Sequence, residues 1–419
     1  MRHLLATWFR LDLLQGNGRF VAALALNAFG AGMFYPFALL YFTAATGLSA
    51  AQVGLVLTVA TLTTLVVTPI TGALVDRLGA RRLVVLSKCL EATGFVLYIG
   101  VSSRTSLFVA VMLTTAGTRM YFTAISTLIA DTASADHRDQ WYGLVSVIQG
   151  IAGSISGAIA AIAIGHGGLG TFRIFVAGNA VCLLLCAWFY ARHSAGGQRT
   201  IAKEQGSAPF AAILRNHAFI RIVLANSLFM LCSMMGSVGL VLYATEVLHA
   251  PLWSLGVIGA MQTAITIGGQ SALLTRLRNV RRTRIMLGAG CAWAAAWGLY
   301  ALGIRVPSRL IVPYLAAIAI VLCVAQMAYG PTARALAAST GSAATQGRTI
   351  ALFELSWGLA AAGAPVTFGV LFDWHAAAPW AAMCGGVMLG IGLIRWSESA
   401  LAIQANRPTA SERTAPAEA

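Results

Sequence analysis

The chain has 419 residues, of which 58% are hydrophobic and 10% charged, and its formal net charge is +15. Soluble chains carry about 25% charged residues, so this composition could not cover the surface of a soluble globule. Intrinsic disorder, nucleic-acid recognition and a secreted disulfide-rich module are also excluded, because they need polar, basic or cysteine-dense sequence. The composition indicates a polytopic membrane protein in contact with the lipid bilayer and without a nucleic-acid partner.

A hydrocarbon core about 30 Å thick is crossed by about 20 apolar residues in helical form. Twelve charge-poor runs of this kind follow one another along the chain, and they lack the alternation typical of barrel strands. The sequence therefore predicts an all-α fold with twelve transmembrane helices. The predicted spans are residues 20–45, 51–75, 83–101, 105–130, 143–165, 171–191, 218–244, 252–274, 285–304, 308–333, 349–372 and 378–396.

The basic residues predict the orientation of the chain in the membrane. Of the 28 Lys and Arg residues, four fall at one face of the predicted bundle (Arg104, Arg173, Arg305 and Arg309), and Arg119 falls within a span. The other 23 lie at the opposite face, in the tails, the connections and the span ends adjoining them. Basic residues accumulate on the cytoplasmic side, so we expect both termini to be cytoplasmic. A retained first span and this pattern suit a multi-pass protein of the bacterial cytoplasmic (inner) membrane.

The two halves of the chain resemble each other. A shift of about 200 residues places Asp76 on Arg276, and a shift of 210 places Gly153 on Gly363. Internal duplication of this kind is typical of transporters that bind substrate between their repeats. We expect two pseudo-symmetric six-helix bundles. The predicted division is an N-terminal half at 1–192, a cytoplasmic linker at 193–217, a C-terminal half at 218–396 and a disordered cytoplasmic tail at 397–419.

The loop after the second predicted span carries a motif. Gly72, Asp76, Arg77, Gly79 and Arg81 match the pattern G-x-x-x-D-R-x-G-R-K/R of the major facilitator superfamily, although Ala80 stands where a base is usual. The chain thus resembles a major facilitator transporter of the bacterial drug or metabolite efflux type over residues 20–396. The resemblance implies that Asp76 docks near residues 348–353 and latches one state of the transport cycle. The alternative is a basic loop that only follows the positive-inside rule.

Ionisable residues inside the spans are the candidates for coupling. A charge at the centre of a span costs about 2.5–3.5 kcal/mol on insertion scales, so Arg119 should face a cavity or a partner. The resemblance places a functional Arg on this helix, and the alternative is a structural Arg paired with Glu91 or a polar neighbour. Glu91 could bind a proton or could pair with Lys88 three residues earlier. Glu354 is a second candidate proton site.

The fifth predicted span contains Gly153-Ser154-x-x-Gly157-Ala158, which resembles a weakened antiporter motif, G-P-x-x-G-G, of the same superfamily. Small residues at this spacing also occur wherever transmembrane helices pack closely. The motif therefore favours export over import only slightly. The resemblance further implies that the first, fourth, seventh and tenth spans line the substrate cavity. Their polar and soft residues are Asn27, Tyr35, Arg119, Asn226, Met230, Met234, Met235, Gln326 and Tyr329.

The sequence carries no Walker A, G-x-S-x-G or H-E-x-x-H pattern, and its seven cysteines show no spacing of metal ligands. We therefore expect a non-enzymatic, monomeric secondary transporter without metal or cofactor. The favoured function is proton-coupled efflux of a drug-like or secondary-metabolite compound that is partly apolar or cationic. The alternatives are a sugar or metabolite importer of the same fold, and a membrane-embedded enzyme or scaffold.

Overall fold

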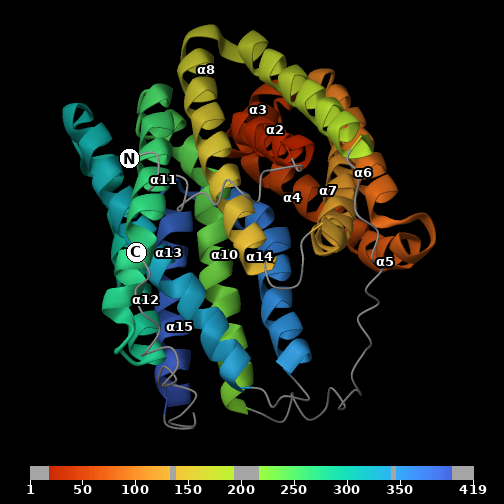
Figure 1. The fold of residues 1–419 in the computed structure, drawn as a ribbon. Helices are drawn as coiled ribbons and strands as arrows, with labels where there is room; N and C mark the ends of the chain where they lie inside the picture. Colours follow the sequence, from red (N-terminus) through yellow and green to blue (C-terminus); the bar gives the residue numbers. More distant parts are fainter. Residues whose placement is uncertain (1–17, 133–137, 193–216, 341–345, 399–419) are drawn as a thin grey trace, which may run out of the picture. The chain divides into compact units, whose positions relative to one another are not determined.

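A computed structural model describes residues 18–132, 138–192, 217–340 and 346–398 of the chain. Within these ranges the chain is built from α-helices and short 3-10 turns (Figure 1). Nine helices of the described part are long and apolar enough to cross a membrane, and two shorter apolar helices span Ala50–Val66 and Ile148–Ile164. The predicted linker up to residue 216 and the predicted tail from residue 399 lie outside the described residues.

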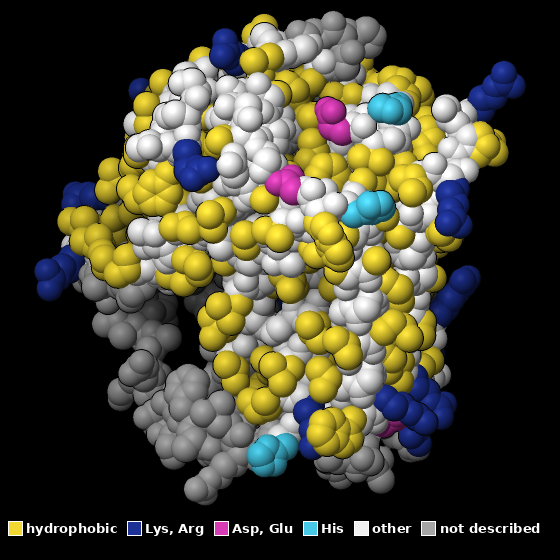
Figure 2. All heavy atoms as spheres, turned by 180° about the vertical axis from the view of Figure 1, so that it is seen from behind, with side chains coloured by type: hydrophobic (Ala, Val, Ile, Leu, Met, Phe, Trp, Pro, Cys, Tyr) yellow, Lys and Arg dark blue, Asp and Glu magenta, His cyan; other side chains and the backbone are white. Residues whose placement is uncertain are grey.

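The chain divides into two units, which are described separately here. The first unit contains residues 1–201 and 251–260, and the second contains residues 202–250 and 261–419. Large hydrophobic side chains remain exposed in each unit, among them Phe122 and Ile174 in the first and Leu389 in the second. Figure 2 shows such side chains over much of the visible surface. Exposed apolar surface on this scale suits contact with lipid rather than with water.

Every predicted span of the first unit lies in a helix. The elements in chain order are α2 (Gly18–Phe34), η2 (Tyr35–Phe37), α3 (Ala38–Thr46), α4 (Ala50–Thr63), η3 (Thr64–Val66), α5 (Val67–Leu78), α6 (Ala80–Ile99), α7 (Arg104–Thr132) and α8 (Arg138–Ala191). The fifth and sixth predicted spans share α8, whose helical geometry is interrupted at Gly168 with φ 59° and ψ −153°. Glycine adopts this backbone conformation without steric cost, so the chain can reverse there.

The second unit follows the same order. Its elements are α10 (His217–Glu246), α11 (Leu252–Leu277), α12 (Arg282–Leu302), η5 (Gly303–Arg305), η6 (Ser308–Leu310), α13 (Ile311–Thr340), α14 (Gln346–Trp374) and α15 (Ala378–Glu398). Helix α11 begins in the first unit and ends in the second. All twelve predicted spans therefore lie on helices, and the predicted all-helical membrane fold is confirmed.

Two predicted spans are not continuous α-helices. Each is interrupted by a 3-10 turn, at Tyr35–Phe37 and at Thr64–Val66. Pro36 lies within the first turn, and Pro69 follows the second by three residues. Proline has no amide hydrogen and disrupts the α-helical bonding of the preceding turn, which explains both interruptions.

Helices α2 and α8 approach each other closely inside the first unit. A Cβ atom added at Gly32 would lie 2.1 Å from the carbonyl oxygen of Gly153 and 2.3 Å from Oγ of Ser156. A Cβ atom at Gly157 would lie 3.3 Å from the carbonyl oxygen of Gly32. The motif of residues 153–158 is therefore part of a helix–helix contact that glycine makes possible.

The same hydrogen bond occurs in both units. The hydroxyl of Tyr41 donates to the backbone carbonyl oxygen of Tyr98 at 2.6 Å. The hydroxyl of Tyr243 likewise donates to the backbone carbonyl oxygen of Tyr300 at 2.8 Å. A shift of 202 residues carries the first pair onto the second. All four tyrosines are buried. The repeated bond is structural evidence for duplication of one six-helix precursor.

Candidate functional site

Two places in the structure concentrate polar side chains inside spanning helices. The first is a charged cluster in the first unit, which we define as Asn27, Lys88, Glu91 and Tyr121. The second is a cavity in the second unit, lined by α10, α11, α12 and α13. Each is built within one unit, so each can be described from its own side chains.

Lys88 and Glu91 form a buried ion pair. The Lys88 amine donates to both carboxylate oxygens of Glu91 at 3.0 Å and to Oδ1 of Asn27 at 2.8 Å. It also lies 3.4 Å from the centroid of the Tyr121 ring, in cation–π geometry. Lys88 is 1% exposed and Glu91 3%. Three side chains, from α2, α6 and α7, thus surround the Lys88 ammonium in the interior of the unit.

The neighbouring helices are shaped around this pair. Because Lys88 and Glu91 are three residues apart on α6, their side chains leave the helix on the same face. Gly117 on α7 provides the space, since a Cβ atom there would lie 2.7 Å from Cγ of Glu91. The Tyr121 hydroxyl lies 3.1 Å from that of Tyr190 on α8. Helices α2, α6 and α7 thus supply the cluster, and α8 contacts it through Tyr190.

Arg119 contacts the interruption between α4 and α5. Its Nε donates to Oγ1 of Thr64 at 3.2 Å, and its Nη2 donates to the carbonyl oxygen of Thr61 at 3.3 Å. Of the predicted structural partners, the polar neighbour is the one observed, since Glu91 pairs with Lys88 and not with Arg119. The guanidinium binds groups that the 3-10 turn presents, and it is partly buried.

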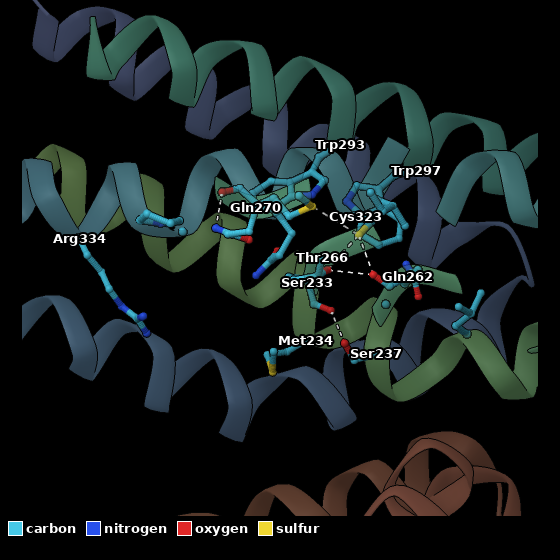
Figure 3. Close-up of a pocket in the computed structure, with 17 residues that line it drawn as sticks. Ser233, Met234, Ser237, Gln262, Thr266, Gln270, Trp293, Trp297, Cys323 and Arg334 are labelled. Atoms are coloured by element: carbon cyan, nitrogen blue, oxygen red, sulfur yellow. Dashed lines mark hydrogen bonds between the residues drawn. The ribbon is translucent and has the colours of Figure 1, made fainter. Parts of the chain in front are cut away.

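The cavity of the second unit has a volume of about 650 Å³ (Figure 3). We call it the larger cavity. Its polar lining residues are Ser233, Ser237, Gln262, Thr266, Gln270, Gln326 and Arg334, and its aromatic ones are Trp293 and Trp297. Small-molecule sites have volumes of about 300–1,000 Å³ and combine apolar walls with a few polar groups, as this cavity does. Among its described lining residues, Arg334 is the one charged side chain.

A polar stripe on α11 forms one wall of the larger cavity. Nε2 of Gln262 donates to the carbonyl oxygen of Ala319 at 3.1 Å, and Nε2 of Gln270 donates to that of Met327 at 3.2 Å. Between them, Oγ1 of Thr266 lies 3.3 Å from Sγ of Cys323. The three side chains project from α11 at four-residue intervals and bridge to α13. Figure 3 shows them along the cavity, with Arg334 at the end far from Trp297.

A smaller cavity of about 120 Å³ lies beside α10, α13 and α14. It brings together four residues that the sequence predicts for a substrate site, namely Asn226, Met230, Gln326 and Tyr329. Gln326, Gly330 and Arg334 line both cavities. The Tyr329 hydroxyl donates to Oδ1 of Asn226 at 2.9 Å, and Nδ2 of Asn226 donates to Oγ of Ser356 at 2.6 Å. These buried groups are thus partnered within the protein, whereas Gln326 is exposed.

The other predicted residues are dispersed. Tyr35 is 49% exposed, and its ring packs against Phe34 and Phe95. Asn27 belongs to the charged cluster rather than to a described cavity. Met234 lines the larger cavity, and Met235 is buried.

The motif residues of the loop between α5 and α6 are described in part. Gly79 joins the two helices with φ +82°, a conformation that favours glycine. Arg77 and Arg81 are exposed. The side chains of Asp76 and Glu354, together with position 72, lie outside what the structure describes. The proposed latch and the second proton site therefore stay predictions.

Sequence reasoning missed the amides on α11, the two indoles on α12 and Arg334. One signal was present, because Gln262, Thr266 and Gln270 recur every four residues in a span without charges. Residues at this interval share one face of a helix, and polar groups in a membrane face the protein interior. The indoles carry no such signal, since tryptophan is also the usual residue of membrane interfaces.

A family model and several solved structures are similar to the chain. Residues 20–365 match the family model described as Major Facilitator Superfamily. A mutant of the nucleoside transporter NupG superposes with a TM-score of 0.75 at 13% identity, covering 91% of this chain and 99% of that chain. A bacterial homologue of the iron transporter ferroportin, in an inward-facing state, superposes with a TM-score of 0.71 at 13% identity. This superposition covers 92% of this chain and 99% of that chain.

A bacterial homologue of the human lysosomal transporter Spinster, in an inward-facing and unoccupied conformation, gives a TM-score of 0.68 at 14% identity. That superposition covers 97% of this chain and 99% of the other. A search of curated protein sequences finds no match to the chain. At these identities the structural likenesses establish the fold, and the family match extends over most of the sequence.

Proposed function

Because the chain belongs to the major facilitator superfamily, we propose that it carries a hydrogen-bonding, partly apolar small molecule across the membrane by alternating access. A multi-pass membrane transporter, rather than an enzyme, follows from the family and the fold. The larger cavity forms part of the substrate site in this proposal. The compound is of the drug-like or secondary-metabolite kind that the sequence suggests.

The chemistry of the cavity wall carries this proposal. Three glutamines, two serines and one threonine offer both donors and acceptors, and two indoles offer flat apolar faces. Arg334, the one charged side chain in the described lining, adds further hydrogen-bond donors. The lining therefore supports a hydrogen-bonding substrate that is partly apolar.

We also propose that transport is export coupled to protons, by a monomer in the bacterial cytoplasmic membrane with both termini in the cytoplasm. The distribution of basic residues supports the orientation. The resemblance of residues 153–158 to the antiporter motif supports export slightly. Import of a sugar or metabolite is the second candidate, and the hydroxyl and amide lining of the larger cavity favours that substrate class equally.

Ligand-induced stabilisation of the purified protein tests the substrate class. The probes are methyl glucoside and uridine as uncharged ligands, benzoate as an anion and tetraphenylphosphonium as a cation. A ligand that binds only the folded state raises the unfolding temperature. We expect a rise with a probe that forms hydrogen bonds, and none with tetraphenylphosphonium, which has neither a donor nor an acceptor. If tetraphenylphosphonium alone stabilises the protein, the proposed substrate class is wrong.

Two variants assign the binding to the cavity. Gln326→Leu removes an amide from the wall of both cavities and should weaken binding of the probe severalfold. Ser227→Ala is the control, because its hydroxyl donates to Val223 within α10 and it lines neither cavity. Flux of the same probe in oriented proteoliposomes, with an imposed pH gradient, then gives the direction and the coupling.

A further inference from the structure

The charged cluster of the first unit has an uncharged counterpart in the second unit. The shift of 202 residues that superposes the repeated tyrosine bond carries Asn27 onto Phe229 and Glu91 onto Trp293. For the next helix the shift is 208 residues, which superposes the ends of α7 and α13 at Thr132 and Thr340 and carries Tyr121 onto Tyr329. In the second unit the rings of Phe229, Trp293 and Tyr329 form an aromatic cluster, with centroids 4.9–5.6 Å apart.

This comparison separates packing from function. One repeat fills the position with three buried rings, so the fold does not need charges there. A buried ion pair costs desolvation free energy and is often replaced by apolar side chains without loss of stability. Ionisable groups kept inside a membrane protein mark ion or substrate pathways. The first unit therefore keeps Lys88 and Glu91 for a reason other than stability.

The partners of Lys88 allow Glu91 to change its charge. The ammonium group has three donors, and two of its partners do not depend on Glu91. These are Oδ1 of Asn27 at 2.8 Å and the Tyr121 ring at 3.4 Å. When a proton neutralises Glu91, the ammonium keeps both contacts and stays charged. When the proton leaves, the carboxylate regains its counter-ion at 3.0 Å.

Few other titratable groups face the carboxyl. Tyr121 from α7, Tyr190 and Cys186 from α8 and Tyr35 from η2 interact with it electrostatically, and Lys88 is the charged group among its described neighbours. Arg119, also on α7, is turned to Thr61 and Thr64 instead. Of the acids whose side chains are described, Glu91 is the one that is buried.

We propose that Glu91 carries the coupled proton and that Lys88 is its fixed counter-ion. The proton adds to one carboxylate oxygen, while the Lys88 ammonium keeps its own proton and its contacts with Asn27 and Tyr121. The same proton leaves to the other side of the membrane later in the cycle. This inference rests on the proposed proton-coupled transport and assigns that coupling to one residue of the first unit.

Infrared difference spectroscopy tests proton binding without any substrate. The protein in lipid vesicles is stepped between low and high pH, and the C=O stretch of protonated carboxyl groups is recorded. A component of this band should be missing in Glu91→Gln and present in Glu398→Gln. Glu398 is the matched control, because it pairs with Arg395 three residues before it but lies at a helix end with an exposed partner. Identical spectra for the wild type and Glu91→Gln would overturn the proposal.

Transport separates this inference from the proposed coupling. With the probe found in the binding screen, Glu91→Gln should lose at least tenfold in gradient-driven accumulation and keep exchange of the probe between the two sides. If the flux through the wild-type protein does not depend on the pH gradient, the proposal of proton coupling itself is wrong. Gradient-driven accumulation retained in Glu91→Gln would leave coupling intact and remove Glu91 as its carrier.

Loss of both activities at an unchanged unfolding temperature would assign Glu91 to the transport cycle itself and would likewise overturn the proposal. If Glu91→Gln does not fold, the double variant Lys88→Gln, Glu91→Gln removes both charges together. It should show exchange without accumulation, and accumulation by this variant would contradict the inference.

Discussion

Glu91 depends on Lys88 for its stability as a buried charge. Both groups are desolvated by burial, and Lys88 is the described counter-ion of Glu91, whereas the Lys88 ammonium also contacts Asn27 and Tyr121. Substitutions of the two residues are therefore expected to be non-additive, because removal of Lys88 leaves the Glu91 carboxylate without its counter-ion. A pair of this kind is a poor source of net stability and a sensitive point for mutation.

Lys88→Met should destabilise the protein by about 3–5 kcal/mol, the usual cost of leaving a buried charge without its partner. Lys88→Met, Glu91→Gln should recover much of that loss. The deficit of the single variant should shrink as the pH falls, because a protonated carboxyl carries no charge to compensate. Denaturant unfolding in detergent at several pH values measures both effects. Equal stability of the single and double variants would show that the ammonium does not compensate Glu91.

Arg334 is the charged side chain in the described lining of the larger cavity, so an anionic ligand bound there would interact with it. Hydrogen bonds to charged groups contribute about 1.5–3 kcal/mol, so Arg334→Gln should weaken an anionic ligand about tenfold or more. An uncharged ligand should bind as before. The unfolding temperature of both proteins, measured at increasing concentrations of benzoate or uridine, distinguishes a loss of anion binding from a general loss of binding. Arg309→Gln, an exposed arginine on η6, is the control for a general change in net charge. A loss of the uncharged ligand alone would contradict the assignment.

Among the helices, the contact of α2 with α8 leaves no space for a methyl group. Gly32→Ala would place its Cβ 2.1 Å from the carbonyl oxygen of Gly153, so the two backbones would have to separate. Overpacking of this kind typically costs about 1–3 kcal/mol. Gly178→Ala on α8 is the control, because its Cβ would meet only Cε of Met33 at 3.8 Å. Thermal unfolding compares them, and equal stability of the two variants would mean that the helices can move apart freely.

The loop between α5 and α6 bears on transport rate rather than on folding. If Asp76 latches one state, as the motif implies, Asp76→Asn should slow transport while expression and unfolding temperature stay at wild-type values. Initial rates in proteoliposomes with the identified probe measure the effect. Arg77→Gln, which changes an exposed base in the same loop, is the comparison for a general change of loop charge. An unchanged transport rate in Asp76→Asn would contradict the predicted role of Asp76 as a latch.

The sequence predicts the helices well because membrane insertion depends on the length and polarity of a run, which are local properties. It does not predict the 3-10 turns in detail, although Pro36 and Pro69 mark their neighbourhood. The cavities depend on which helix faces meet, which no local pattern contains. Gln326, which the family resemblance assigns to a substrate cavity, lines both described cavities, and its role in binding stays a prediction. Trp293 and Trp297 are found only from the packing of α12.

At the scale of the whole molecule, duplication explains both what the units share and where they differ. The tyrosine bond between corresponding helices is kept in both, with the same separation of 57 residues. The interior position beside it has diverged into a charged cluster in one unit and an aromatic cluster in the other. The shared bond is thus a structural element of the six-helix unit, and the diverged position is where the two units acquire different roles.

The repeated bond predicts matched effects of two substitutions. Tyr41→Phe and Tyr243→Phe each remove a hydroxyl that donates to a buried carbonyl oxygen, which is worth about 0.5–1.5 kcal/mol and more where the acceptor stays unsatisfied. Tyr41 also interacts with Arg173, so its loss should cost at least as much as that of Tyr243. The bonds share no partner, so the double variant should lose the sum. Unfolding in detergent measures all three variants, and a cost confined to one unit would show that the bond no longer serves the same purpose in both.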